Sequence, residues 1–278
     1  MRSSARSGRG SASRSRIAAE VTGIDQRLSV HSVTFHGATL REYSSRWDSL
    51  GVRRLSLIDA QLADPALADV VAAGGYSVES VFHLFSSTDG LRRVIASAAT
   101  VGARVVYMLT GGRGERSWED AAGVFCDAVY PCLDEARQAG VALAIENASG
   151  LYADIHIAHT LADTIELAES AGLGICIDLF HCWTEAHLNT LLDRALPRTE
   201  LIQLSDYVLG DRALPARAVP GDGAIPLESL LAHALGGGYR YGFDLELIGP
   251  RIAEEGALPA AQRACARVTE VLSRMEER

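Results

Sequence analysis

Eight short apolar runs recur along the chain, and each is followed by a stretch with the pattern of a helix. The runs cover residues 29–35, 52–59, 77–85, 103–109, 141–146, 173–178, 201–206 and 241–247. Strands that alternate with helices pair in parallel, because each helix carries the chain back to the starting edge of the sheet. Eight such units over about 250 residues predict a (β/α)8 barrel in a single domain. A doubly wound sheet is the alternative, although FHGATL, after the first run, lacks the glycine-rich phosphate turn usual in that fold.

The intervening helices are expected at residues 40–50, 89–101, 118–139, 160–171, 184–193, 226–235 and 258–275, with one more that ends near residue 73. Glycine marks several helix ends, since Gly51, Gly140 and Gly172 each come directly before a predicted strand. Glycine is favoured there because it adopts the left-handed backbone conformation without a steric penalty. These glycines support the helix–strand boundaries at three places.

The first 27 residues differ from the rest in composition. Five arginines and no acidic residue lie among the first sixteen, which otherwise are mainly serine, glycine and alanine. Such a segment has little apolar surface to bury, so residues 1–27 are expected to be a disordered tail and residues 28–278 the barrel. The tail could be a basic arm for nucleic acid or a membrane surface, or a dispensable extension.

The charge and cysteine content limit the partners and the compartment. The formal net charge is −9, so the part beyond the first sixteen residues carries −14. An acidic body argues against nucleic-acid binding, which needs clustered positive charge. No apolar run has the length of a membrane span. The five cysteines are an odd number without a CxxC pair, which favours reduced thiols and a cytoplasmic protein.

Alternation along four strands separates small or polar residues from bulky apolar ones. Glu146 shares a face with two alanines, Asp178 with Cys176, and Glu246 with a second acid, while leucine, isoleucine, valine and aromatic residues face the other way. On the seventh strand the same split turns Gln203 inward. The bulky face would pack on the helices, and the small and polar face would line the barrel.

Glu146, Asp178, Gln203 and Glu246 are therefore expected to converge at the carboxyl ends of the strands. Three carboxylates this close repel one another unless positive charge lies between them. One divalent cation bound by these four residues is the simplest solution, and oxygen ligands suit Mn²⁺ or Mg²⁺. Asp206 is a rival ligand on the seventh strand. Two cysteines close to Asp178 could suggest zinc, but their spacing is not that of a zinc motif.

Five motifs in this order resemble the xylose-isomerase-like barrel superfamily, the sugar-phosphate isomerases and epimerases. They are GVALAIEN, GICIDLFH, LIQLSD, RAVPGDGAIP and GYRYGFDLEL. The resemblance covers about residues 141–247. The first four strands resemble the superfamily only in their alternation with helices. It implies that Glu146, Asp178, Glu246 and the inward residue of the seventh strand bind one divalent metal. Many members have histidine on that strand, and Gln203 here is similar to the hydroxypyruvate-isomerase-like branch.

The resemblance also implies roles for residues outside the metal ligands. Arg217, in R-x-x-P-G-x-G, matches a substrate-binding arginine of the epimerases, and His181 matches a histidine that contacts substrate hydroxyls. His83 is a further candidate for the substrate pocket. Endonuclease IV belongs to the same superfamily and needs extra histidines for a three-metal site. His83 could supply one, but the set is incomplete.

The expected reaction is proton transfer next to the carbonyl of a hydroxyketone, sugar or sugar phosphate. One of Glu146 and Glu246 would take the proton and the other return it, His181 would position a substrate oxygen, and the cation would stabilise the enediolate. The order of the strands does not say which glutamate is the base. Isomerisation, epimerisation and loss of a β-hydroxyl all pass through the same enediolate, so a dehydratase is the alternative enzyme.

The alternative to an enzyme is a non-catalytic barrel subunit of a larger complex, which would keep the metal for its structure. The expected partner is a small carbohydrate-like molecule, and the chain could pair as a homo-oligomer.

Overall fold

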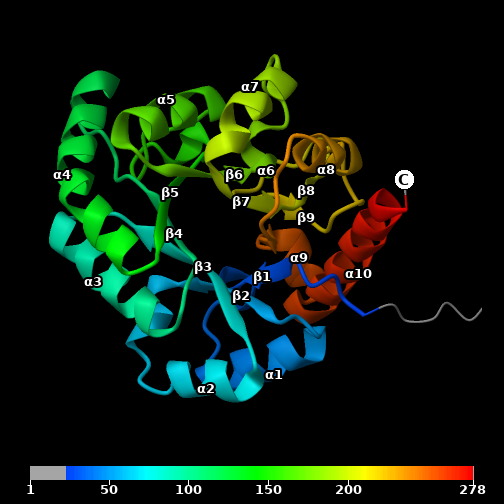
Figure 1. The fold of residues 1–278 in the computed structure, drawn as a ribbon. Coiled ribbons are helices and arrows are strands. Elements are labelled where there is room, and N and C mark those ends of the chain that lie inside the picture. The colour runs from blue at the N-terminus through cyan, green and yellow to red at the C-terminus, as the bar shows by residue number, and fades with distance from the viewer. Residues whose placement is uncertain (1–22, 278) are drawn as a thin grey trace, which may run out of the picture.

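Eight parallel strands form the centre of the molecule in the computed structural model, which describes residues 23–277 (Figure 1). The barrel strands are β1 (Leu28–His31), β2 (Arg54–Ile58), β3 (Ser77–Leu84), β4 (Val105–Leu109), β5 (Ala142–Glu146), β6 (Gly174–Asp178), β7 (Thr199–Leu204) and β10 (Phe243–Leu245). They pair in the order β1–β10–β7–β6–β5–β4–β3–β2 and close on themselves. The predicted (β/α)8 barrel is confirmed.

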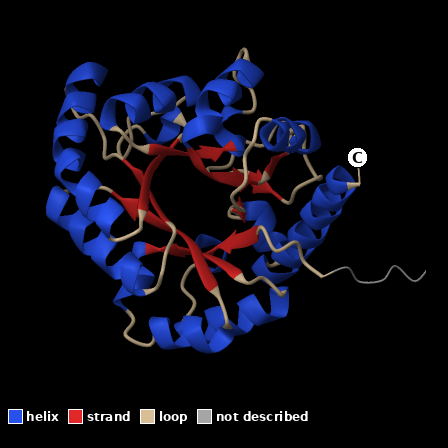
Figure 2. Cartoon of the chain, in the orientation of Figure 1, coloured by secondary structure: helices blue, strands red, loops and turns tan. Residues whose placement is uncertain are grey.

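The helices form a ring outside the strands (Figure 2). The longer ones are α1 (Leu40–Leu50), α2 (Leu67–Gly74), α3 (Thr88–Thr100), α4 (Trp118–Gln138), α5 (Leu161–Ala171), α7 (Leu188–Ala195), α8 (Leu227–Gly236) and α10 (Ala257–Glu276). The short ones are α6 (Leu179–Cys182) and α9 (Pro250–Glu255), with 3-10 turns η1 (Ser32–Phe35), η2 (Asp59–Ala63), η3 (Gly150–Tyr152) and η4 (Leu196–Arg198).

Local sequence sets several of these boundaries. Thr39 and Thr160 begin α1 and α5 with capping boxes. In each box the threonine hydroxyl accepts a backbone N–H from the first turn, and an acidic side chain of that turn accepts the backbone N–H of the threonine. Gly51, Gly140 and Gly172 have φ of 71°, 72° and 69°, as expected at the ends of these helices.

Three predicted elements differ from the structure. The first strand ends at His31, because its Nδ1 accepts the N–H of Val33 and starts the 3-10 turn η1. The single helix expected at 184–193 is replaced by α6 and α7. The last helical region begins earlier than expected, with α9, and is interrupted at Gly256, where φ is 93°.

The barrel has two separate apolar layers, and the alternation along the strands predicts them correctly. The interior is filled by Val105, Tyr107, Ala144, Cys176 and Leu201. The bulky residues of the opposite strand face, such as the isoleucines of β5 and β6, belong to the larger core between strands and helices. The inward positions therefore remain small or polar at the carboxyl ends, where they leave room for a cavity.

A buried ion cluster closes the other end of the barrel. Glu79 is 3% exposed and pairs with Arg54 and Arg104, whose Nε is 2.7 Å from Glu79 Oε1. Arg104 also pairs with Glu200 at 2.7 Å and lies 4.1 Å from the ring centroid of Tyr241. These charged groups stabilise the amino-terminal end of the strands, away from the cavity.

A small antiparallel hairpin, β8 (Asp206–Tyr207) and β9 (Arg217–Ala218), follows β7 and stands apart from the barrel sheet. Asp206 fixes the loop beyond it by accepting the backbone N–H groups of Gly221, Gly223 and Ile225 at 2.8–3.0 Å. This contact explains Asp206 as a loop anchor, and the hairpin brings Arg217 back toward the barrel.

The start of the described chain lies against the last helix. The backbone N–H of Asp25 donates to Thr269 on α10, and Arg27 pairs with Asp25 and Glu276. The rest of the predicted tail, residues 1–22, lies outside the described residues.

Within residues 23–277 no helix is long and apolar enough to cross a membrane. All five cysteines are unpaired.

Candidate active site

A cavity of about 370 Å³ opens at the carboxyl ends of the strands. Its polar lining is His31, Asp59, Tyr107, Glu146, Tyr152, His181, Arg217 and Glu246. Ends of parallel strands in a barrel meet at one face, so residues far apart in sequence are collected there. This is where the sequence predicts the site.

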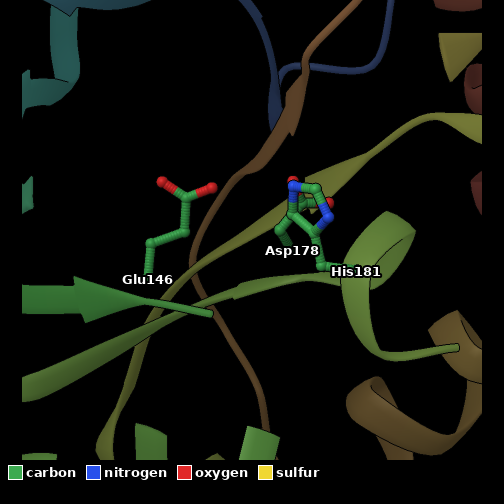
Figure 3. A group of neighbouring side chains, drawn as sticks. All are labelled: Glu146, Asp178 and His181. Atoms are coloured by element: carbon green, nitrogen blue, oxygen red, sulfur yellow. The ribbon is translucent and has the colours of Figure 1, made fainter. Parts of the chain in front are cut away.

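Glu146, Asp178 and His181 form a group with the chemistry of a metal site (Figure 3). One ligand atom from each lies within 4.8 Å of the others. Glu146 reaches in from the end of β5, while Asp178 ends β6 and begins α6, which carries His181 (Figure 3). The side-chain amide of Asn147 joins the two strand ends by donating to the carbonyl and accepting the N–H of Asp178, both at 2.9 Å.

Arg217 provides a positive charge among these acids. Its Nη2 lies 2.6 Å from Asp178 Oδ2 and 3.3 Å from Glu246 Oε1, and its Nη1 donates to Ser205 at 3.1 Å. The guanidinium carbon is 4.7 Å from the ring centroid of Phe180, and the residue is 3% exposed. Burial opposes the charge of Arg217, but attraction to the acids outweighs it and raises the pKa. Part of the carboxylate repulsion is therefore relieved by the protein itself.

The pKa values of the three acids are shifted in different directions. Burial would raise the pKa of Asp178, but Arg217 outweighs it and lowers that pKa. Burial, together with the charges of Glu246 and Asp178, raises the pKa of Glu146 well above its usual value. Burial also raises the pKa of Glu246, which Arg217 opposes. Burial lowers the pKa of His181 to about 4, so its imidazole is neutral near pH 7.

The donor set fits a divalent cation. Glu146 is 6% exposed, and no residue of the described chain donates a hydrogen bond to its carboxylate. A buried carboxylate without a donor is unfavourable unless a cation or a proton compensates it. Two carboxylates and a neutral imidazole are common ligands of such ions. A cation here would share Asp178 with Arg217.

Comparison with known proteins agrees with this geometry. The family described as "Xylose isomerase-like TIM barrel" matches residues 67–267. The chain belongs to this family. A comparison with curated proteins finds no significant match.

Solved structures share the fold of this xylose-isomerase-like barrel. IOLI protein with a bound zinc atom is 18% identical, covers 89% of this chain and 98% of its own, and has a TM-score of 0.76. D-psicose 3-epimerase with D-tagatose from Clostridium cellulolyticum H10 is 13% identical, covers 88% and 98%, and has a TM-score of 0.71. The probable 3-DHS dehydratase AsbF from Bacillus anthracis is 11% identical, covers 89% and 98%, and has a TM-score of 0.68. At these identities the likeness shows the fold alone.

In this xylose-isomerase-like barrel, the side-chain nitrogen of Gln203 contacts the other residues of the site. Its Nε2 donates to Glu246 Oε2 at 2.8 Å and to the Tyr107 hydroxyl at 3.1 Å, while its Oε1 lies 3.4 Å from Cys176 Sγ. To bind a cation through oxygen, the amide would have to turn over. Its role as a ligand stays a prediction.

The structure does not bring His83 into the cavity. Its Nδ1 lies 2.6 Å from Asp59 Oδ2, and both residues line a neighbouring groove beside η2 and α3. On β3 it is Phe82, the preceding residue, that lines the cavity. The substrate-binding role of His83 therefore finds no support in the position of its side chain.

The cysteines near Asp178 are buried thiols. Burial raises the pKa of Cys176 and of Cys182 well above the usual value. A zinc site would need thiolates, so these side chains are better explained as core residues.

Four polar residues of the cavity were not predicted from the sequence, and they are His31, Asp59, Tyr107 and Tyr152. The alternation used for β5, β6, β7 and β10 would have found His31 and Tyr107. Tyr107 lies two positions after Val105 on the inward face of β4, and His31 lies two positions after Ser29 on β1.

Proposed function

We propose that this chain is a divalent-metal-dependent isomerase or epimerase acting on a hydroxyketone, sugar or sugar phosphate. The observation that carries the proposal is that Glu146, which is buried, and Glu246, which is partly buried, line one cavity beside the Asp178–Arg217 pair. Two carboxylates facing one substrate can take a proton from carbon and return one elsewhere.

Glu146, Asp178 and His181 would hold the cation, with Glu246 as a further predicted ligand. Gln203, the remaining residue of the predicted set, would bind only if its amide turned over and gave up its hydrogen bonds to Glu246 and Tyr107. Mn²⁺ or Mg²⁺ remains the proposed ion. A bound divalent cation supplies Lewis-acid polarisation of the carbonyl and stabilises negative charge that develops on oxygen.

The protein groups divide the remaining work. One of Glu146 and Glu246 removes the proton next to the carbonyl, and the other returns a proton to the neighbouring carbon or to the opposite face. Gln203 orients Glu246 by its hydrogen bond of 2.8 Å. His181, neutral near pH 7, hydrogen-bonds a substrate oxygen, and Arg217 binds another with the N–H groups that its carboxylate partners leave free.

Metal content is the first test. Elemental mass spectrometry of the purified protein, supplied with Mn²⁺, should find about one ion per chain, and much less in Asp178→Ala. Glu246→Gln should lower the affinity for the ion less than Asp178→Ala if Glu246 acts mainly on the proton. A wild-type protein that takes up no ion would end the metal-dependent proposal.

Solvent exchange is the second test. Incubation with ketoses and Mn²⁺ in D₂O should place deuterium on carbon in the recovered sugar, and Glu146→Gln should abolish it. Metal uptake without exchange in any ketose would favour the barrel subunit without chemistry.

A dehydratase is the second candidate. Burial raises the pKa of Glu146, and a carboxyl that holds its proton can donate it to a leaving hydroxyl. Release of an unsaturated ketone, seen by its ultraviolet absorbance, would distinguish this reaction from isomerisation.

A further inference from the structure

We propose that His31 and Tyr107 form a hydroxyl-binding subsite in the cavity, and that this subsite selects an uncharged, unphosphorylated hydroxyketone or sugar. The inference rests on the proposed function, because it places the substrate in the same cavity. With Phe82, the two residues make a ring cluster (His31, Phe82, Tyr107) in which neighbouring ring centroids lie 5.6–6.3 Å apart. All three residues line the cavity.

His31 presents an N–H group without an acceptor. Its Nδ1 accepts the backbone N–H of Val33 at 3.1 Å, so the neutral ring carries its hydrogen on Nε2. Nε2 has no hydrogen-bond partner among residues 23–277, and His31 is 3% exposed. Burial lowers the pKa of His31, which keeps the ring neutral. An unpaired buried donor is unfavourable, and a hydrogen bond to a substrate oxygen would remove this cost.

Tyr107 supplies a second neutral donor. Its hydroxyl oxygen accepts from Gln203 Nε2 at 3.1 Å, and within the described chain its hydrogen has no acceptor. A tyrosine hydroxyl has an ordinary pKa of about 10, so it is protonated near pH 7 and can donate. Gln203 thereby fixes the oxygen and leaves the O–H free for substrate.

The charge of the cavity disfavours a phosphate. The sequence contains no lysine. Within the described part of the chain, Arg217 is the basic residue of the lining, and it is already paired with Asp178 and Glu246. Asp59, Glu146 and Glu246 also face the cavity, and a phosphate dianion would add negative charge to theirs.

The cavity lining also contains the apolar residues Val33, Ile58, Leu109 and Ile248. These apolar side chains can contact the C–H groups of a sugar ring or a short carbon chain, while His31 and Tyr107 bind its hydroxyls.

The test uses the full chain supplied with Mn²⁺ and three probes: D-tagatose, D-fructose and D-fructose 6-phosphate. Deuterium exchange in D₂O gives kcat and KM for each probe. The wild type should exchange the free ketoses at least about tenfold more efficiently than the phosphate. Tyr107→Phe and His31→Leu should each raise KM for the ketoses about tenfold to a hundredfold, the range for a lost hydrogen bond to substrate.

Two variants separate substrate binding from packing. His31→Gln keeps an N–H near the position of Nε2 and should recover most of the affinity that His31→Leu loses. His36→Leu changes an exposed histidine outside the cavity lining and should leave KM unchanged. Thermal unfolding checks that each variant is folded, and Tyr107→Phe still tests the subsite if His31→Leu does not fold.

The outcomes distinguish the subsite from the proposed function. Efficient exchange of the phosphate, or a KM in His31→Leu and Tyr107→Phe equal to that of the wild type, would overturn the subsite and leave the isomerase intact. Absence of exchange in all three probes would overturn both.

Discussion

At the residue scale, the main electrostatic feature is that Asp178 belongs to two groups. It forms an ion pair with Arg217, and it is one of the three candidate metal ligands with Glu146 and His181. The Asp178–Arg217 distance of 2.6 Å describes a close ion pair with both partners buried. Removing one partner of such a pair leaves a charge without compensation. The arginine and a cation would thus act on the same carboxylate from two sides.

Replacing Arg217 by methionine should show whether the arginine and a cation both neutralise Asp178. Loss of a buried partner is expected to lower the free energy of unfolding by about 3 kcal/mol. Because Mn²⁺ can then neutralise Asp178 and Glu246 alone, adding it should raise the Tm of Arg217→Met more than that of the wild type. Thermal unfolding with EDTA and with Mn²⁺ measures both shifts. Equal shifts would mean that the ion binds elsewhere.

Replacing Glu146 should increase the stability of the metal-free protein and abolish its activity. Its carboxylate is buried and lacks a donor, so Glu146→Gln is expected to stabilise the metal-free protein by about 1 kcal/mol while removing the exchange reaction. Urea unfolding in EDTA measures the first effect. Glu135→Gln, at an exposed ion pair with Arg92, is the control and should change stability by less. A metal-free Glu146→Gln protein less stable than the wild type would contradict this account.

At the element scale, His156 ties the ends of β4 and β5 together. Its Nδ1 accepts the N–H of Thr110 at 3.1 Å and its Nε2 lies 2.8 Å from the Glu146 carbonyl oxygen, an arrangement that suits a neutral ring. Burial lowers the pKa of His156 from 6.5 to about 4. The connection that positions Glu146 therefore depends on this residue staying uncharged.

Acid should weaken this connection. Because the unfolded chain binds the proton first, His156 lowers stability as pH falls from 6.5 to 4, by up to about 3 kcal/mol, and has no such effect above 6.5. In His156→Gln the free energy of unfolding should fall less steeply across that range. Urea unfolding at several pH values compares the two proteins. Parallel curves would contradict the assignment.

The strands could be predicted more fully than the loops that complete the site. The period of two along β5, β6, β7 and β10 identifies Glu146, Asp178 and Glu246, because each side of a strand meets a different environment. Arg217 reaches the acids from a hairpin without periodicity, so its pairing with Asp178 could not be predicted from alternation. On β3 the face that carries Ser77, Glu79 and His83 is the more polar one, so the alternation does not identify Phe82 as the residue that lines the cavity.

At the scale of the whole molecule, one end of the barrel contributes to stability and the other contains the cavity. The amino-terminal end holds Glu79 between two arginines, and the carboxyl-terminal end holds the cavity. Glu79→Gln leaves Arg54 and Arg104 facing each other, which should lower the free energy of unfolding by about 2–3 kcal/mol, since both arginines are partly exposed.

The activity of folded Glu79→Gln should remain that of the wild type, because the cluster does not line the cavity. Chemical unfolding and the exchange assay together check the two effects. A large fall in kcat with unchanged stability would show that the two ends are coupled.

The barrel closes where β1 pairs with β10, and Ser29 donates to Asp244, 215 residues away in the sequence, at 2.7 Å. His31 belongs to the first strand of the barrel, and Glu246 follows the last. During synthesis on the ribosome, a chain that has not yet released the residues after β7 has neither this seam nor a complete cavity. The groups that line the cavity are therefore complete only after the residues up to Glu246 have left the ribosome.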